Sequence, residues 1–150
     1  MEKGALILPE MILFYYEENK LDKITGLISG GAKVDLDGKT AVDTFVRAAE
    51  KNYIEVVKLF IEAGILIDSE DKDHRTALSV ACGKGHQELV TYLLSAGADA
   101  VHYYNGRYDQ VAPIIEAAKN DQLEIARLLF SSAAYKKELL SLIHISEPRD

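Results

Sequence analysis

The sequence has little of three features that would point to a secreted, membrane-spanning or nucleic-acid-binding protein. It holds a single cysteine, Cys82, so no disulfide forms within the chain and the fold needs no oxidising compartment. No stretch reaches the roughly 18 apolar residues of a membrane span. Basic residues are outnumbered, 17 against 24 acidic ones, and the net charge of −7 disfavours binding to nucleic acid or to an anionic membrane. We therefore predict a cytoplasmic, intracellular protein, with a secreted effector acting inside a host cell as the alternative.

The apolar run ALILPEMILFYY near the N-terminus does not have the pattern of a secretion signal. Glu2 precedes it, Pro9 and Glu10 interrupt it, and no small-residue cleavage site follows. The chain has 150 residues, of which 48% are hydrophobic, and this is enough to bury about two thirds of the unfolded surface. We expect a folded protein with its own core.

A period of 33 residues runs through the chain. Three segments align with that spacing: NKLDKITGLISGGAK, NYIEVVKLFIEAGIL and GHQELVTYLLSAGAD. A fourth, DQLEIARLLFSSAAY, follows the third after 36 residues, so three residues are inserted before it. The repeat spacing predicts units at about residues 5–36, 37–69, 70–102 and 103–135, followed by a separate segment at 136–150.

Two columns of this alignment predict turns. One holds residue types that tolerate positive φ, as the turn that closes a first helix requires: Asn19, Asn52, Gly85 and Asp121. The other column closes each second helix with a glycine: Gly31, Gly64 and Gly97. In the last copy, Ala133 stands at this position.

Two further patterns place the helices. An acidic column puts a carboxylate in the first turn of each second helix, where the helix dipole favours negative charge: Asp22, Glu55, Glu88 and Glu124. The first helices are expected to begin behind Asp43 and Thr76, which are good N-caps, and at Pro113. A pair of small residues recurs within these first helices: Ala48 and Ala49, Ala81 and Cys82, Ala117 and Ala118.

The third unit, RTALSVACGKGHQELVTYLLSAGAD, resembles an ankyrin repeat, whose pattern runs T-P-L-H-x-A-A, then G-H, then an apolar helix and G-A-D. The matching residues are Thr76, Leu78, Ala81, Gly85, His86, Leu93, Leu94, Gly97, Ala98 and Asp99. The resemblance extends over residues 37–69 and 103–134, is weaker over 5–36 and ends at about Tyr135. It implies an all-α solenoid of helix-turn-helix units joined by hairpin-like finger loops. It also implies a non-catalytic, monomeric protein-protein interaction module without a cofactor.

Two segments allow a chemical interpretation, and in both a structural role is favoured. Cys82 and His86 are four residues apart, a spacing that a thiolate and its base can use on one helix face, but no orienting third residue is apparent. The GKG between them lacks the phosphate-loop pattern. The acidic segment DSEDKDHR, residues 68–75, lacks the glycine and the spacing of a calcium loop, so we expect a turn rather than a metal site.

Two surfaces are predicted to bind a partner protein. The first, which we call the tyrosine finger, is VHYYNGRYDQ at residues 101–110; it contains the insertion and the residue types that dominate interface hot spots, Tyr103, Tyr104, Arg107 and Tyr108. The second, the first-helix strip, consists of the expected outward positions of the first helices on the concave side: Arg47, Lys51, Val80, Lys84, Glu116 and Asn120.

The last residues, KKELLSLIHISEPRD, have no counterpart in the repeats. They are interpreted either as a capping helix over the end of the stack or as a non-native tail. For the whole chain, the alternative to an independent binding module is a regulatory or targeting fragment of a larger ankyrin-containing enzyme or effector. A hydrolase that uses Cys82 is the third hypothesis.

Overall fold

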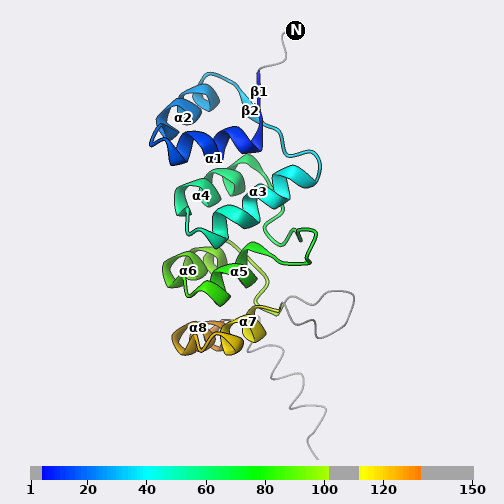
Figure 1. Cartoon of the computed structure of the whole chain (residues 1–150), viewed down its shortest axis with the longest axis vertical. Helices are drawn as coiled ribbons and strands as arrows, with labels where there is room; N and C mark the ends of the chain where they lie inside the picture. The colour runs from blue at the N-terminus through cyan, green and yellow to red at the C-terminus, as the bar shows by residue number, and fades with distance from the viewer. Residues whose placement is uncertain (1–4, 102–111, 133–150) are drawn as a thin grey trace, which may run out of the picture. The chain divides into compact units, whose positions relative to one another are not determined.

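The computed structural model describes residues 5–101 and 112–132, which belong to two compact units, residues 1–77 and 78–150. The first unit contains β1 (Leu6–Ile7), α1 (Pro9–Glu17), α2 (Leu21–Ser29), β2 (Lys33–Val34), α3 (Lys39–Glu50) and α4 (Ile54–Ala63) (Figure 1). The second contains α6 (Gln87–Ser95), α7 (Pro113–Lys119) and α8 (Leu123–Ser131), and α5 (Ala77–Lys84) begins at the boundary. The predicted all-α class is confirmed. None of the helices described is long and apolar enough to cross a membrane.

The core of the first unit lies where α1 and α4 both pack against α3, while α2 packs mainly against α1. Phe45 of α3 and Phe60 of α4 are fully buried, with their ring centroids 6.0 Å apart. Ile12 and Ile24 are also completely buried, and they attach α1 and α2 to this core. Apolar residues at helical spacing therefore turn one stripe of α3 and one of α4 inward.

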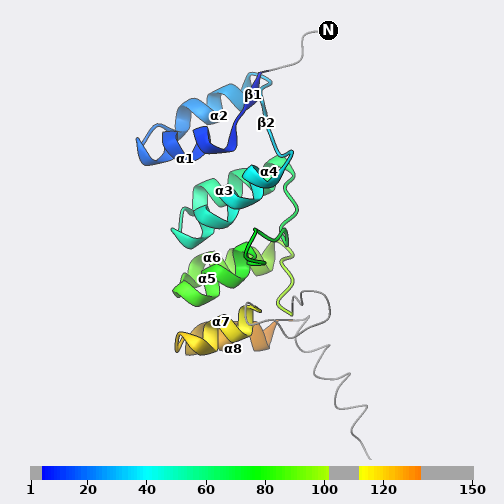
Figure 2. The same cartoon turned by 45° about the vertical axis from the view of Figure 1, so that its right-hand side comes forward.

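In the second unit, α8 packs against both α6 and α7, and Figure 2 shows α7 and α8 side by side. Leu93 of α6 and Leu129 of α8 are fully buried. Helix α5 is buried at every residue from Ala77 to Cys82, so the small residues of this helix lie inside the protein, as the small-residue pattern predicts.

Both predicted turn columns are confirmed. The residues of the first column have φ values between 55° and 78°, and the three glycines of the second have φ values between 99° and 104°. The hydrogen bonds repeat as well: the amide after each glycine donates to the carbonyl five residues back, as from Ile65 to Phe60 at 3.1 Å and from Ala98 to Leu93 at 2.9 Å. The acidic column also lies in the first turns of α2, α4, α6 and α8.

The predicted helix starts are correct at two positions and wrong at one. Helix α7 begins at Pro113, and α5 begins directly after Thr76. Asp43, however, lies inside α3, which begins four residues earlier behind Gly38. Ala41, one turn before Phe45, is completely buried, and this burial extends the apolar stripe of α3 by one turn toward the N-terminus.

A short parallel pairing between β1 and β2 was not expected from the sequence. Leu6 pairs with Lys33 and Ile7 with Val34. The amide of Lys33 donates to the carbonyl of Ala5 at 3.0 Å, and the amide of Asp35 donates to the carbonyl of Ile7 at 2.9 Å. This pairing ties the start of the chain to the segment that follows α2, and it buries Ile7.

Two glycines should respond to substitution with opposite signs. Gly97 has a φ of 99°, which L residues rarely adopt, so we expect Gly97→Val to lower the free energy of unfolding by about 1 to 3 kcal/mol. Gly26 lies within α2, and a Cβ atom there would meet nothing within 4 Å. Gly26→Ala should therefore raise stability by about 0.5 to 1 kcal/mol.

Urea unfolding followed by circular dichroism measures both effects. An unchanged stability of the Gly97→Val protein would contradict the strained helix end.

Candidate protein-binding surfaces

The tyrosine finger lies almost entirely outside the described residues. Its four candidate contact residues, Tyr103, Tyr104, Arg107 and Tyr108, all fall within the range 102–111, outside the described residues. The segment 136–150, predicted as a cap or a tail, is also outside the described part. Binding through the tyrosine finger remains a prediction.

The part of the first-helix strip in the first unit is exposed but already makes contacts. Arg47 and Lys51 are both exposed, and Lys51 Nζ lies 3.1 Å from Glu17 Oε1. The hydroxyl of Tyr53 donates to the same oxygen at 3.2 Å, and the ring of Tyr53 lies against that of Tyr16. The hydrogen bond and the charge of Lys51 lower the pKa of Glu17. These contacts link α1 to the segment after α3. The carboxylate of Glu17 partly neutralises the charge of Lys51.

In the second unit, one residue of the first-helix strip does not point outward as predicted. Lys84 and Asn120 are exposed and Glu116 is half-buried. Glu116 pairs with Lys119 at 3.0 Å and accepts a hydrogen bond from the Asn120 side chain at its backbone carbonyl, 2.8 Å away. Val80, predicted to point outward, is instead buried, with 7% of its surface exposed. The prediction for Val80 is wrong because α5 is enclosed over most of its length, so an apolar side chain there lies in the interior.

Cys82 lies in an environment that suppresses thiol chemistry. It is completely buried in α5, and burial, together with the nearby charge of Glu116, raises its pKa to about 12. His86 does not share its helix: α5 ends at Lys84, Gly85 turns the chain, and His86 is the N-cap residue of α6. The helical spacing considered for a nucleophile and its base is therefore not formed.

The acidic segment at residues 68–75 folds as a turn around Asp71. Its Oδ1 accepts hydrogen bonds from the amides of Asp73 and Arg75, each at 2.9 Å. Its Oδ2 is 2.9 Å from Nη2 of Arg75, and Asp71 is 8% exposed. Both carboxylate oxygens are thus occupied by the segment itself, which supports the turn interpretation. Across the described residues, no three His, Cys, Asp or Glu side chains are grouped so as to hold a metal ion.

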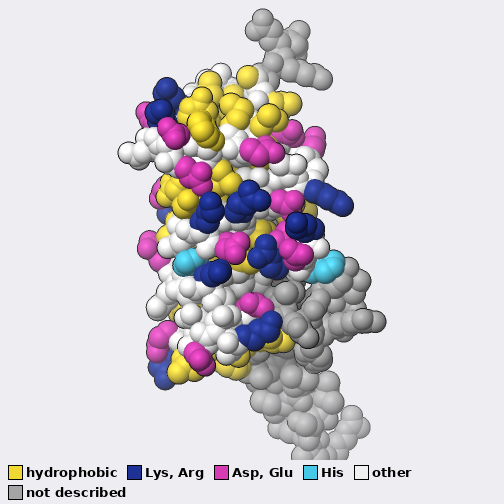
Figure 3. Space-filling model, viewed as in Figure 1, with side chains coloured by type: hydrophobic (Ala, Val, Ile, Leu, Met, Phe, Trp, Pro, Cys, Tyr) yellow, Lys and Arg dark blue, Asp and Glu magenta, His cyan; other side chains and the backbone are white. Residues whose placement is uncertain are grey.

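Two features of the first unit were not found from the sequence. The first is an exposed apolar surface: Figure 3 shows hydrophobic side chains gathered over the first helix pair. The large hydrophobic residues of this part of the chain that are between 36% and 65% exposed are Leu6, Leu8, Met11, Phe14, Leu27 and Ile28. Exposed apolar surface of this kind commonly marks an interaction site.

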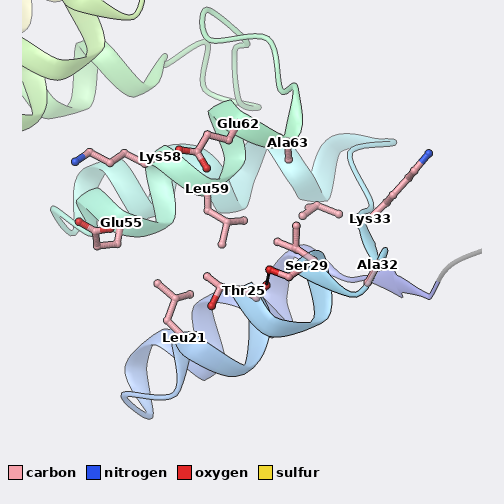
Figure 4. Close-up of a pocket in the computed structure, with 12 residues that line it drawn as sticks. Leu21, Thr25, Ser29, Ala32, Lys33, Glu55, Lys58, Leu59, Glu62 and Ala63 are labelled. Carbon is pink, nitrogen blue, oxygen red and sulfur yellow. Dashed lines mark hydrogen bonds between the residues drawn. The ribbon is translucent and has the colours of Figure 1, made fainter.

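The second feature is a groove between α2 and α4, with a volume of about 660 Å³ (Figure 4). Leu21, Thr25 and Ser29 of α2 line one side, and Leu59 and Ala63 of α4 line the other. The repeat pattern gave no signal for it, because the groove depends on the distance between two helices rather than on the residues of either one.

Comparison with known proteins identifies the class. The family described as "Ankyrin repeats (3 copies)" matches residues 12–104 and 45–139. The chain is 30% identical over 106 residues to "Ankyrin repeat and KH domain-containing protein mask-1" of Caenorhabditis elegans, covering 69% of this chain and 4% of that protein. It is 32% identical over 109 residues to "Putative ankyrin repeat protein FPV014" of Fowlpox virus, covering 72% and 24%, respectively. It is 35% identical over 102 residues to the human "BCL-6 corepressor-like protein 1", covering 64% and 5%.

These matches, together with the repeated helix pairs and turns, define a helical repeat protein of the kind that binds other proteins. The chain belongs to the ankyrin repeat family. Ankyrin repeat domains are generally non-catalytic protein-interaction modules. The chain spans less than a quarter of the length of each of the three relatives named above.

Proposed function

We propose that this chain is a non-catalytic module that binds a partner protein through the tyrosine finger and through the first-helix strip without the buried Val80. The observation that carries the proposal is the exposure of Lys51, Lys84 and Asn120. These residues occupy the same position in three successive sequence repeats. A repeated, exposed polar position on a rigid helix pair suits recognition of a partner, because the side chains are held in place without belonging to the core.

The chemistry of the described residues supports binding rather than catalysis. Cys82 is buried with a raised pKa, and the carboxylate of Asp71 is hydrogen-bonded within its own turn. Neither group is presented to a substrate. Arg47 and Lys84 add exposed positive charge to a chain of net charge −7, and this favours a partner with acidic groups opposite these positions.

The experiment is capture of a partner from native lysate, followed by calorimetry with the variant in which Tyr103, Tyr104, Arg107 and Tyr108 are all replaced by Ser. We expect affinity to fall by about thirtyfold or more, equivalent to about 2 kcal/mol, because single hot-spot residues commonly contribute this much. Helicity and melting temperature should stay close to those of the wild type. Wild-type affinity in this variant would refute the role of the finger, and Arg47, Lys51 and Lys84 would then be tested by reversal of charge.

A second candidate is a regulatory or targeting part of a larger protein. The small share of each relative that the chain covers, 4% to 24%, favours it. The intact mass of the native protein tests this candidate. A mass equal to that of these 150 residues would contradict it.

A further inference from the structure

The groove between α2 and α4 is formed because α2 packs loosely. Only Ile24 among the nine residues of α2 is buried, and α2 packs mainly against α1. The α2 side chains that point toward α4 include Thr25 and Ser29, which are short (Figure 4). They do not reach across to Leu59, so space remains between the two helices.

The floor of the groove is apolar. Leu59 points into it from α4, and Leu21 and Ile28 line it from α2. Ile28 is 36% exposed, so the apolar lining of the groove is partly open to solvent. A volume of about 660 Å³ is in the range in which apolar side chains of a ligand can be enclosed.

The two hydroxyl groups that line the groove are able to accept hydrogen bonds from a ligand but not to donate them. Thr25 Oγ1 donates its proton to the carbonyl of Asp22 and Ser29 Oγ donates to that of Thr25, each at 2.9 Å. Both hydroxyl oxygens therefore keep only lone pairs for a ligand.

Four charged side chains line the groove, two acidic and two basic: Glu55, Glu62, Lys33 and Lys58. Glu55 and Glu62 on α4 are exposed, and no salt bridge joins either carboxylate to another residue of the described ranges. The side chains of Lys33 and Lys58 extend away from the groove (Figure 4). A ligand with cationic donors therefore complements the edge formed by α4.

The spacing of the two carboxylates indicates the shape of the ligand. Glu55 and Glu62 are seven residues apart on one helix, which is two turns or about 10.5 Å. Two cationic residues at positions i and i+7 of another helix have the same separation. An apolar stripe at i, i+3 and i+4 positions of that helix would lie against Leu59 and Ile28, as in other helix-in-groove complexes.

We propose that the groove between α2 and α4 binds an amphipathic helix of a partner protein that carries Lys or Arg residues seven positions apart beside an apolar stripe. This groove shares no residue with the first-helix strip or with the tyrosine finger. The two proposals therefore stand or fall independently.

The test uses two fluorescent 18-residue peptides, each with a leucine stripe, one with Lys and one with Glu at two positions seven apart. Anisotropy of the full chain with each peptide measures affinity. We expect the Lys peptide to bind more tightly than the Glu peptide, and the amides of Thr25, Leu59 and Ala63 to shift in heteronuclear NMR spectra. Failure of the Lys peptide to bind, equal binding of the two peptides, or shifts confined to other residues would overturn the proposal.

The repeat supplies matched controls for each variant. Glu55→Lys and Glu88→Lys change the same column by the same charge, and only Glu55 lines the groove. Ser29→Arg and Ser95→Arg are matched in the same way, since both serines are exposed and at the same repeat position. We expect affinity for the Lys peptide to fall about fivefold in Glu55→Lys and at least about tenfold in Ser29→Arg.

Both matched variants, Glu88→Lys and Ser95→Arg, should bind the Lys peptide like the wild type. Equal losses in a groove variant and its control would also overturn the proposal. The quadruple variant of the tyrosine finger should bind the Lys peptide with wild-type affinity. Binding at the groove is therefore tested separately from the partner binding proposed for the tyrosine finger. If one groove variant fails to fold, the other still tests whether the peptide binds in the groove, because Glu55 and Ser29 lie on different helices.

Discussion

Replacing Phe45 by alanine is expected to lower the free energy of unfolding of the first unit by about 3 to 5 kcal/mol. Phe45 is completely buried and lies against the ring of Phe60, with an interplanar angle of 54°. Removing the ring leaves a cavity at the centre of the contact between α3 and α4, and the neighbouring helices close such a cavity only in part. Since domains are commonly stable by only about 5 to 15 kcal/mol, this loss should be easy to measure.

Urea unfolding followed by circular dichroism gives the result, and Phe14→Ala is the matched control. Phe14 is 59% exposed on α1, so its replacement removes the same ring without opening an internal cavity. We expect a change of less than about 1 kcal/mol for this control. Similar losses in the two variants would contradict the assignment of the core.

Alkylation of Cys82 by iodoacetamide should be at least about a thousandfold slower in the native protein at neutral pH than in denaturant. Burial, with a contribution from the charge of Glu116, raises the pKa of the Cys82 thiol from 9.0 to about 12. The reactive thiolate is therefore about a thousandfold less populated than in the unfolded chain. The complete burial of the side chain slows the reaction further.

The same shift predicts how stability depends on pH. Because the pKa of Cys82 is raised in the folded state, its contribution to stability is fully present below pH 9.0 and is lost as the pH rises toward about 12. Between these values the unfolded chain has lost a proton that the folded chain still holds. A Cys82→Ala variant should lack this part of the alkaline loss of stability, measured by urea unfolding at several pH values.

Mass spectrometry follows the alkylation, and an introduced thiol provides the reference rate. Ser95 is exposed at the end of α6, so Ser95→Cys in a Cys82→Ala background should react at the rate of a free cysteine. Native Cys82 that reacts as fast as this reference would contradict its burial. It would also support the hypothesis of a catalytic cysteine.

The sequence by itself determined the turns and the spacing of the repeats. A turn that requires positive φ admits few residue types, so the positions of Asn52 and Gly64 were readable without any knowledge of the neighbouring helices. The start of α7 was equally local, because Pro113 suits only the first turn of a helix. The small residues Ala81 and Cys82 indicated close packing, and their complete burial confirms it.

Only the tertiary structure decided which surfaces are exposed. Val80 was expected to face outward from its position in the repeat, but α5 is enclosed on more sides than the period of one helix predicts. The groove beside Leu59 depends on how far α2 lies from α4, and the pairing of Ile7 with Val34 joins segments 27 residues apart. Local sequence fixes the backbone angles of a turn, whereas the distance between two packed elements is set by all the side chains between them.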